Sequence, residues 1–163
     1  METRPLSIST EPSRIDRSLV HEFLSARSYW AAGIPRDVVD RSIEGALCFA
    51  VYDGDAQVGF ARVITDRATF AYLADVFVLE SHRGRGIATW LMEVIAGHPE
   101  LRNLRRWILM TRDAHGLYAK FGFRPIEKPG NCMEIVDREV YRRRPASESP
   151  SPPPLARREG KDP

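Results

Sequence analysis

The sequence has little of what marks a secreted or a membrane protein. Only two of its 163 residues are cysteines, Cys48 and Cys132. The opening stretch METRPLSIST lacks the apolar core of a secretory signal. Without such a signal, we expect both cysteines to remain thiols, each in a strand. No stretch approaches the roughly 20 apolar residues that a membrane-spanning helix needs, so we expect a cytoplasmic protein without a membrane partner.

The net charge is also small, and metal-ligand spacings are absent from the sequence. The formal net charge is only +2, which does not by itself indicate a nucleic-acid partner. The basic stretch RRWILM is too apolar for a surface that binds nucleic acid. His115 lies two residues from Asp113, a spacing that does not make a metal pair, and no other ligand spacing occurs. We therefore expect no nucleic acid and no metal.

What the chain does contain is typical of one globular domain. The hydrophobic fraction is 43% and the charged fraction 28%, both ordinary for a soluble domain. A chain of this length fits a single domain with a substantial core. From Arg142 onward, proline, serine and charged residues dominate, with little to bury. We expect residues 1–141 to form the domain and residues 142–163 to be a disordered tail.

Hydrophobic periodicity predicts an alternation of strands and helices. Ser13 is expected to cap the first helix, Pro35 to lie in the first turn of the second, and Asp53-Gly54 to form a hairpin turn. The expected order is a strand from Leu6, two helices, a hairpin of residues 46–52 and 57–65, a strand from Thr69 to Leu79, a helix from Ile87, a buried strand from Arg105, a helix from Ala114 to Phe121 and a strand from Cys132 to Val136. A strand–helix–strand crossover should make the strands near Val76 and Trp107 parallel. The fold class is therefore α/β: a mixed, mostly antiparallel twisted sheet flanked by helices.

A basic glycine turn, RGRGIAT from Arg83 to Thr89, joins the strand YLADVFV to the following helix. Gly84 and Gly86 permit positive φ and let a ligand approach the main chain. The first N–H groups of the helix lack intrahelical partners, and the helix dipole makes them attractive to an anion. Arg83 and Arg85 would repel one another without an anion. The turn predicts a diphosphate site, although neither the dinucleotide fingerprint nor the P-loop is present.

Three segments, in this order along the chain, resemble the GNAT family of N-acetyltransferases. ALCFAVYDGDAQVGFARVIT resembles a hairpin of that family. RGRGIA matches its coenzyme A signature, an Arg or Gln followed by x-x-Gly-x and then Gly or Ala. GLYAKFGF resembles its helix-to-strand segment. The resemblance covers residues 46–136, while roughly the first forty residues agree only in the order of their elements.

The resemblance implies acetyl-CoA as co-substrate, bound where two parallel strands splay near Val78 and Trp107. The main chain of the first strand would pair with the pantetheine arm and polarise the thioester carbonyl, and the glycine turn would hold the pyrophosphate. Many relatives have an Asn seven residues before the family tyrosine, where this chain has Thr111, a weaker contact. The cofactor-binding residues implied in this way are Val76, Phe77, Val78, Arg83, Gly84, Arg85, Gly86, Ile87, Ala88, Thr89 and Thr111.

Two side chains are candidates for catalysis. Tyr118 matches the family tyrosine, whose hydroxyl can protonate the departing thiolate, and the alternative is a core tyrosine that packs on Phe121 and Phe123. Asp75 is the only charged residue of FAYLADVFVL. Burial would raise its pKa and favour a base that deprotonates the amine, as the carboxylate of similar family members suggests. The alternatives are an aspartate hydrogen-bonded to main chain, or deprotonation through water.

The acceptor pocket of the family is usually walled by the first two helices and the loop that joins them. In this chain that loop is SARSYWAAGIP, so Tyr29 and Trp30 are candidate substrate-binding residues. One of them is expected to line the pocket, and an aromatic wall suits a small or flat amine. His115 either faces the acceptor or is merely exposed, and we favour the exposed position.

These observations favour an N-acetyltransferase that transfers acetyl from acetyl-CoA directly to a primary amine of a small molecule. Neither cysteine has the base partner that a covalent acetyl-enzyme requires. The alternatives are acetylation of a protein N-terminus or lysine, and a non-catalytic sensor of acyl-CoA. A homodimer is usual in the family, but the sequence does not determine the oligomeric state.

Overall fold

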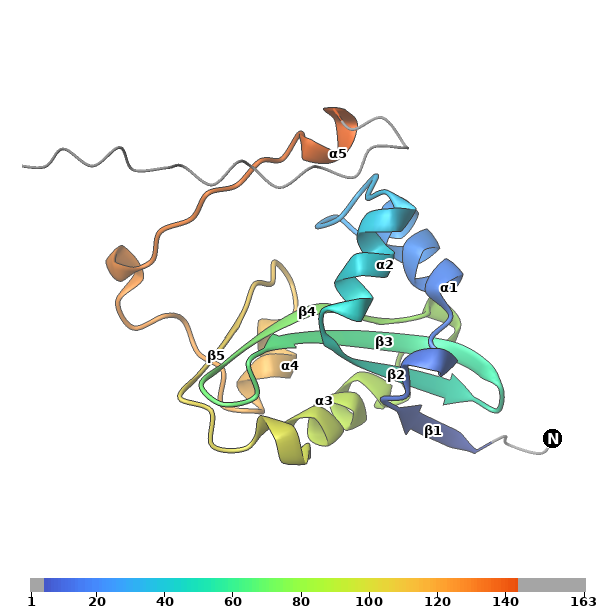
Figure 1. Cartoon of the computed structure of the whole chain (residues 1–163). Helices are drawn as coiled ribbons and strands as arrows, with labels where there is room; N and C mark the ends of the chain where they lie inside the picture. The colour runs from blue at the N-terminus through green and yellow to red at the C-terminus, as the bar shows by residue number, and fades with distance from the viewer. Residues whose placement is uncertain (1–4, 144–163) are drawn as a thin grey trace, which may run out of the picture.

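The computed structural model describes residues 5–143, and its centre is a five-stranded sheet with the order β1-β2-β3-β4-β5 (Figure 1). Neighbouring strands from β1 to β4 pair antiparallel, and β5 pairs parallel with β4. The strands are β1 Leu6–Ser9, β2 Leu47–Asp53, β3 Ala56–Thr65, β4 Phe70–Val78 and β5 Arg106–Leu109. The predicted mixed sheet, its hairpin and its parallel pair are confirmed.

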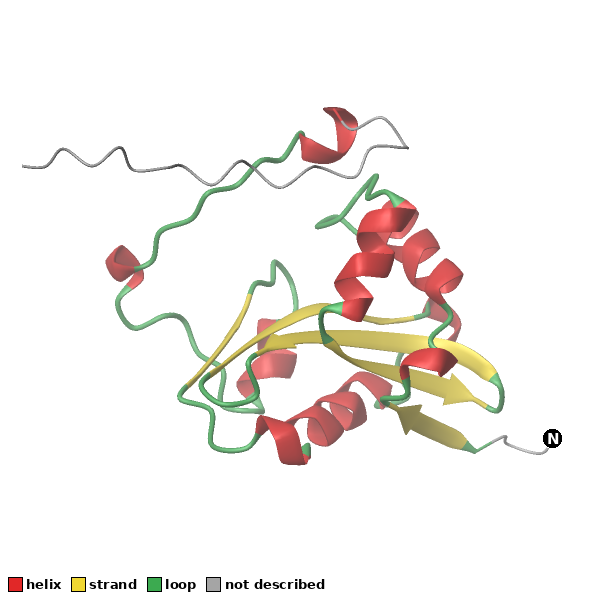
Figure 2. Ribbon diagram, viewed as in Figure 1, coloured by secondary structure: helices red, strands yellow, loops and turns green. Residues whose placement is uncertain are grey.

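Helices cover both faces of this sheet, as Figures 1 and 2 show. One face carries α1 and α2, and the other carries α3 and α4. The helices are α1 Arg17–Glu22, which continues into a π-helical turn at Phe23–Arg27, α2 Arg36–Glu44, α3 Ile87–Gly97, α4 His115–Ala119 and α5 Val140–Arg143. Among the described residues, no helix has both the length and the apolar character needed to cross a bilayer.

Strand β2 is an inner strand of the sheet, and its position explains why its sequence is continuously apolar. Phe49 and Val51 belong to the core that packs on α3, whereas Cys48, Ala50 and Tyr52 belong to the core that packs on α1 and α2. Successive side chains of a strand point to opposite faces, and here both faces are covered by helices. The strand therefore buries nearly all of its side chains and shows no alternation with polar residues.

The start of the first helix differs from the prediction, because Asp16 and not Ser13 is its N-cap. Residues Pro12–Arg14 form a separate 3-10 turn, and Ile15 is extended. The Asp16 carboxylate then accepts a hydrogen bond of 2.9 Å from the Leu19 N–H. An aspartate is as good a cap as a serine, so local sequence alone could not choose between the two positions.

The predicted strand from Cys132 to Val136 is wrong, and so is the prediction that β5 is buried. Residues 132–136 are extended but pair with no described strand, and Cys132 is exposed. Consequently β5 is the last strand of the sheet, with Arg106 exposed and the rest half-buried. Of the predicted tail, Arg142 and Arg143 lie in α5, and residues 144–163 lie outside the described residues.

Candidate active site

Strands β4 and β5 diverge after a short parallel ladder. The ladder begins with Phe70 opposite Arg106 and ends with Leu73 opposite Leu109. Beyond Leu73, β4 continues to Val78 and pairs only with β3 on its other side. The β5-facing edge of this second half of β4 is thus left without a strand partner among residues 5–143. An open main-chain edge of this kind can pair with an extended ligand.

The glycine turn follows directly from this open edge and leads into α3. Gly84 has φ +73° and Gly86 has φ +75°, both in the left-handed region. Gly86 is the N-cap of α3, and the first bond of the helix runs from the Trp90 N–H to the Gly86 carbonyl, at 3.0 Å. The N–H groups that precede Trp90 in the first turn therefore remain available to a ligand. The predicted positive φ angles and helix start are confirmed.

The two arginines of the turn are not as unpaired as the sequence suggested. Arg83 donates from Nε to the Val78 carbonyl at 3.0 Å. Arg85 has its guanidinium 3.7 Å from the Asp53 carboxylate, which also contacts His82 at 3.2 Å. The predicted repulsion between Arg83 and Arg85 in the absence of an anion is therefore wrong, because each has a partner within the chain. Both side chains stay half-exposed beside the turn.

Asp75 occupies a β-bulge in the diverging half of β4. Between the pairs Phe60–Phe77 and Arg62–Ala74, one residue of β3 faces two residues of β4, Asp75 and Val76. Asp75 has φ +54°, a conformation that Asp tolerates better than most residues. Because a bulge alters the direction of side chains, Asp75 need not follow the alternation of the strand.

Both oxygens of the Asp75 carboxylate are held by other side chains. Oδ2 accepts from Arg62 Nε at 2.7 Å, and Oδ1 accepts from Trp30 Nε1 at 2.9 Å. The carboxylate is 8% exposed and the Arg62 side chain 16%, so this is a largely buried ion pair. The alternative of an aspartate bound to main chain is not observed. Arg62 was not among the predicted site residues, although it is the one charged residue of QVGFARVIT.

The loop between α1 and α2 reaches over the bulge through two aromatic residues. Trp30 and Tyr29 pack edge to face with ring centroids 5.0 Å apart, and both remain more than two-fifths exposed. The Tyr29 hydroxyl accepts from the Arg112 N–H at 3.0 Å, and the Arg112 guanidinium lies 3.8 Å from the Tyr29 ring centroid. The loop, β4 and the loop after β5 thus meet at one place, with the aromatic faces open to solvent.

Tyr118 lies in α4 and belongs to the same core cluster as Val78 and Ile87. Its side chain is buried and packs edge to face on Phe123, while no described residue hydrogen-bonds to its hydroxyl. Burial, then the nearby Tyr29 and Asp113, raises the pKa of Tyr118 to about 12. The phenol therefore keeps its proton at neutral pH and is left with a free donor.

The remaining two candidates lie at the start of α4. Thr111 accepts a hydrogen bond of 3.0 Å from the Ala114 N–H through Oγ1, so it fixes the turn before the helix. His115 is exposed on the first turn of α4. In residues 5–143 no cluster of three or more His, Cys, Asp or Glu could hold a metal ion.

Comparison with known proteins assigns this arrangement to a family. The model of the GNAT acetyltransferase domain matches residues 44–125. A predicted acetyltransferase of Gibberella zeae is 31% identical over 136 residues, covering 69% of this chain and 75% of the relative. The chain belongs to the GNAT family of acetyltransferases.

Solved structures of other acetyltransferases have the same fold. A predicted GNAT acetyltransferase from Xanthomonas campestris pv. campestris has a TM-score of 0.82 and 47% identity, over 86% of this chain and 99% of that protein. A predicted acetyltransferase of Clostridium acetobutylicum, crystallised with acetyl-CoA, has a TM-score of 0.54 and 14% identity, over 81% of this chain and 96% of that one. This second likeness shows the fold alone. GNAT acetyltransferases use acetyl-CoA.

Proposed function

We propose that this acetyltransferase is an N-acetyltransferase that moves acetyl from acetyl-CoA directly to a primary amine of a small molecule. The observation that carries the proposal is the continuity of the open β4 edge, the glycine turn and the free N–H groups of α3. Tyr118 and the Arg62–Asp75 ion pair would then border the place where an acyl group attached to such a ligand ends.

The residues present fit coenzyme A. The main chain of Val76–Val78 would pair with the pantetheine arm, and the first turn of α3 would hold the pyrophosphate. A Cβ built on Gly84 or Gly86 meets no atom within 4 Å, so the space in front of both residues is open. The half-exposed guanidinium groups of Arg83 and Arg85 add charge next to that space. Thr111 would make a weaker contact with the arm, since its hydroxyl already caps a turn.

Acetyl-CoA supplies a thioester that an amine can attack without a covalent enzyme intermediate. The buried thiol of Cys48 is no competing nucleophile, because burial raises its pKa to about 12. Tyr118 would donate a hydrogen bond from its hydroxyl to the departing sulfur. The pKa of the phenol is about 12, whereas a thiol ordinarily has a pKa of about 8.5. Complete transfer of the phenol proton to the thiolate is therefore unfavourable, and the hydroxyl contributes mainly by stabilising the charge that develops on sulfur.

The acceptor side is assigned to the surface made by Tyr29, Trp30 and Arg112. The aromatic faces are open and rigidly placed, because Trp30 is bonded to Asp75 and Tyr29 to the Arg112 main chain. Such a surface suits a small, flat amine. His115 follows Arg112 by three residues in sequence and is the further substrate-binding candidate. Asp75 can act as the base only if one of its two hydrogen bonds opens, so we assign it the positioning of Trp30 and leave proton removal to water.

A screen for thiol release from acetyl-CoA across amino acids, polyamines, amino sugars, aryl amines and peptides tests the proposal. We expect turnover with one class of small amines and none with peptides. Turnover confined to peptide N-termini or lysines would instead indicate a protein acetyltransferase. Tight binding of coenzyme A with no turnover in any class would indicate a sensor, and the absence of coenzyme A binding would refute the site as a whole.

The variant Gly86→Ala tests the diphosphate site. Alanine at φ +75° is strained by about 1–2 kcal/mol, and relaxing that strain turns the first N–H groups of α3 away from the ligand. We expect about a tenfold loss of affinity for coenzyme A by calorimetric titration, together with a lower free energy of unfolding.

Gly97→Ala is the matched control for this variant. Gly97 ends the same helix without a positive φ, and its Cβ would also meet nothing within 4 Å. Its affinity for coenzyme A should equal that of the wild type. Equal affinities of the two variants would show that the nucleotide does not bind at the start of α3.

A further inference from the structure

The Arg112 guanidinium is a fixed cation at the acceptor surface, which is made by Tyr29, Trp30 and Arg112. It lies over the Tyr29 ring, 3.8 Å from the ring centroid, and the Arg112 main chain donates to the Tyr29 hydroxyl at 3.0 Å. Tyr29 packs edge to face on Trp30, whose indole in turn donates to Asp75. Although the Arg112 side chain is exposed, it is therefore held against a ring that is itself fixed.

The edge of this guanidinium has donors without acceptors. In residues 5–143, no carboxylate forms an ion pair with Arg112, and no oxygen accepts a hydrogen bond from its side chain. Stacking uses the face of a guanidinium and leaves the N–H groups in its plane free. The Tyr29 hydroxyl accepts from Arg112, and none of these residues accepts its own proton. Donors that converge in this way suit an anionic group of a ligand.

The other acidic and basic side chains of this part of the site leave the charge of Arg112 available. The Asp75 carboxylate is already paired with Arg62, at 2.7 Å. Asp113 and His115 are exposed, and within the described part of the chain neither forms an ion pair, with Arg112 or with any other residue. Apart from the histidine, the acceptor surface and its border therefore carry one unpaired cation, Arg112, and one unpaired anion, Asp113.

These two charges lie near the reacting end of the site. Burial, then the nearby Tyr29 and Asp113, raises the pKa of Tyr118 to about 12, so both groups are close to that phenol. Under the proposed function, Tyr118 borders the thioester. An ammonium group attracted to Asp113 is thereby brought toward the acetyl group. Arg112, which stacks on Tyr29, is left to bind a second, anionic group of the same molecule.

We propose that the acceptor is an amino carboxylic acid, whose carboxylate binds the edge of the Arg112 guanidinium while its amine points toward the thioester. A planar carboxylate matches two parallel N–H donors of a guanidinium. The rest of the molecule lies against Trp30, which is 44% exposed. This inference rests on the proposed function and narrows it to one class of small amine. Polyamines, amino sugars and simple aryl amines lack the carboxylate and should be poor acceptors.

Matched pairs of amines test the inference, since the members of each pair differ only in having a carboxylate or its carboxamide. The carboxamide keeps the size and the planarity of the group and removes its charge. The pairs are glycine and glycinamide, β-alanine and β-alaninamide, phenylalanine and phenylalaninamide, and para-aminobenzoate and para-aminobenzamide. With thiol release from acetyl-CoA as the assay, the best acid should have a kcat/KM about tenfold or more above that of its amide.

The variant Arg112→Gln should remove this preference. We expect kcat/KM for the acid to fall about tenfold, mainly through KM, because the carboxylate is bound equally before and in the transition state. The value for the amide should change by less than about twofold. Arg112→Lys keeps the charge and loses the paired donors, so its value for the acid should lie between the two. The main-chain N–H that bonds Tyr29 is present in both variants, which keeps Tyr29 in place.

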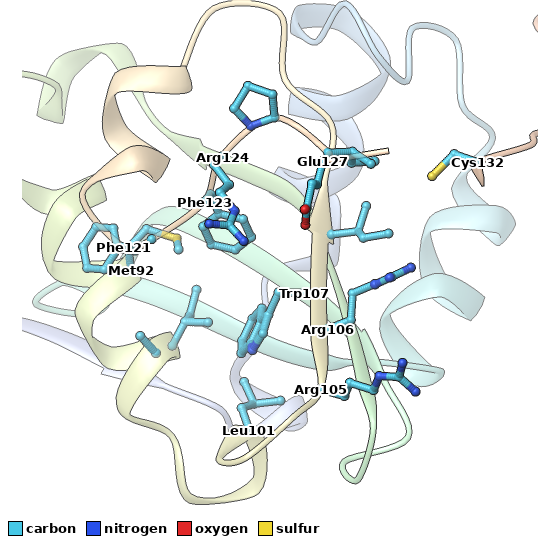
Figure 3. Close-up of a pocket in the computed structure, with 16 residues that line it drawn as sticks. Met92, Leu101, Arg105, Arg106, Trp107, Phe121, Phe123, Arg124, Glu127 and Cys132 are labelled. Carbon is cyan, nitrogen blue, oxygen red and sulfur yellow. The ribbon is translucent and has the colours of Figure 1, made fainter. Parts of the chain in front are cut away.

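Arg106→Gln is the matched control for this variant. Arg106 is an exposed arginine at the opposite end of β5, where it lies next to Phe70 in the ladder. Figure 3 shows its side chain on the side of the strand away from Trp107. The variant should turn over acids and amides as the wild type does. A loss for acids as large as that of Arg112→Gln would show that overall charge, and not a contact with Arg112, selects the acid.

Three further results would overturn the inference. In the first, the wild type turns over amides as well as acids, which leaves the proposed N-acetyltransferase in place and removes only the carboxylate. In the second, Arg112→Gln lowers kcat/KM for acids and amides alike, since Arg112 would then merely support Tyr29. In the third, no amine gives thiol release although calorimetric titration detects binding of coenzyme A, which refutes the proposed function and this inference with it.

Discussion

Replacing Tyr118 by Phe should lower kcat about 100-fold, because one hydrogen bond to the charge that develops on the departing sulfur is lost. Affinity for coenzyme A should not change, since the hydroxyl contacts neither the diphosphate turn nor any described residue. The measurement is thiol release with the best amine of the screen, next to a calorimetric titration. Burial raises the pKa of Tyr118 to about 12, so wild-type kcat should show no loss from ionisation of this phenol up to about pH 10.

Tyr52→Phe is the matched control for this prediction. Its hydroxyl donates to the Arg14 carbonyl at 2.8 Å on the α1 side of the sheet, so its loss should reduce stability and leave kcat unchanged. If Tyr118→Phe retained full turnover, Tyr118 would be only a core residue that packs on Phe123.

Replacing Asp75 by Ala should lower the free energy of unfolding by about 3 kcal/mol or more. The change leaves the Arg62 guanidinium, only 16% exposed, without its counter-ion, and it places alanine at a positive φ. Asp75→Asn also removes the counter-ion, but its one carbonyl oxygen still accepts from either Arg62 or Trp30 and Asn tolerates the same φ, so we expect a loss smaller by about 1–2 kcal/mol than that of Asp75→Ala. Urea unfolding followed by circular dichroism measures both.

Asp37→Ala provides the control for a pair at the surface. Arg41 and Asp37 form an ion pair along α2 at 3.3 Å, with both side chains about half-exposed. Exposed pairs of this kind contribute less than about 1 kcal/mol. If Asp75→Ala were no more destabilising than Asp37→Ala, the Arg62–Asp75 pair would not be a buried ion pair in solution.

The same variants separate the two roles considered for Asp75. If Asp75 is the base, Asp75→Asn should remove turnover and leave the affinity for the amine unchanged. If Asp75 instead positions Trp30, the carbonyl oxygen of Asp75→Asn can still accept from the indole N–H, so this variant should retain most of kcat, while Trp30→Ala should raise the KM for the amine. The split between kcat and KM therefore decides between these roles.

The parts of the fold that the sequence predicted are those set by residues close to one another along the chain. The apolar run of β2, the hairpin turn at Gly54 and the glycine turn before α3 are all specified within a few positions, since φ preferences and helix starts are local properties. The parallel pairing of β4 with β5 was also predictable, because the handedness of the crossover leaves little choice. These elements already place the glycine turn and the start of α3 beside an open strand edge.

Other parts of the site were decided only by the tertiary structure. Arg62, Trp30 and Asp75 are brought together by a bulge in β4 and by a loop that returns across 45 residues of chain, and no local pattern encodes such a meeting. For the same reason the sequence suggested an isolated buried carboxylate at Asp75, where the fold supplies a counter-ion, Arg62. Residues 132–136 have the alternation of a strand, but a strand needs an edge to pair with, and within the described part of the chain that pairing is not made. Sequence determined which segments can form strands, helices and the glycine turn before α3. Only the packing of the whole chain decided which side chains become partners, because contacts between distant residues depend on the path of the backbone.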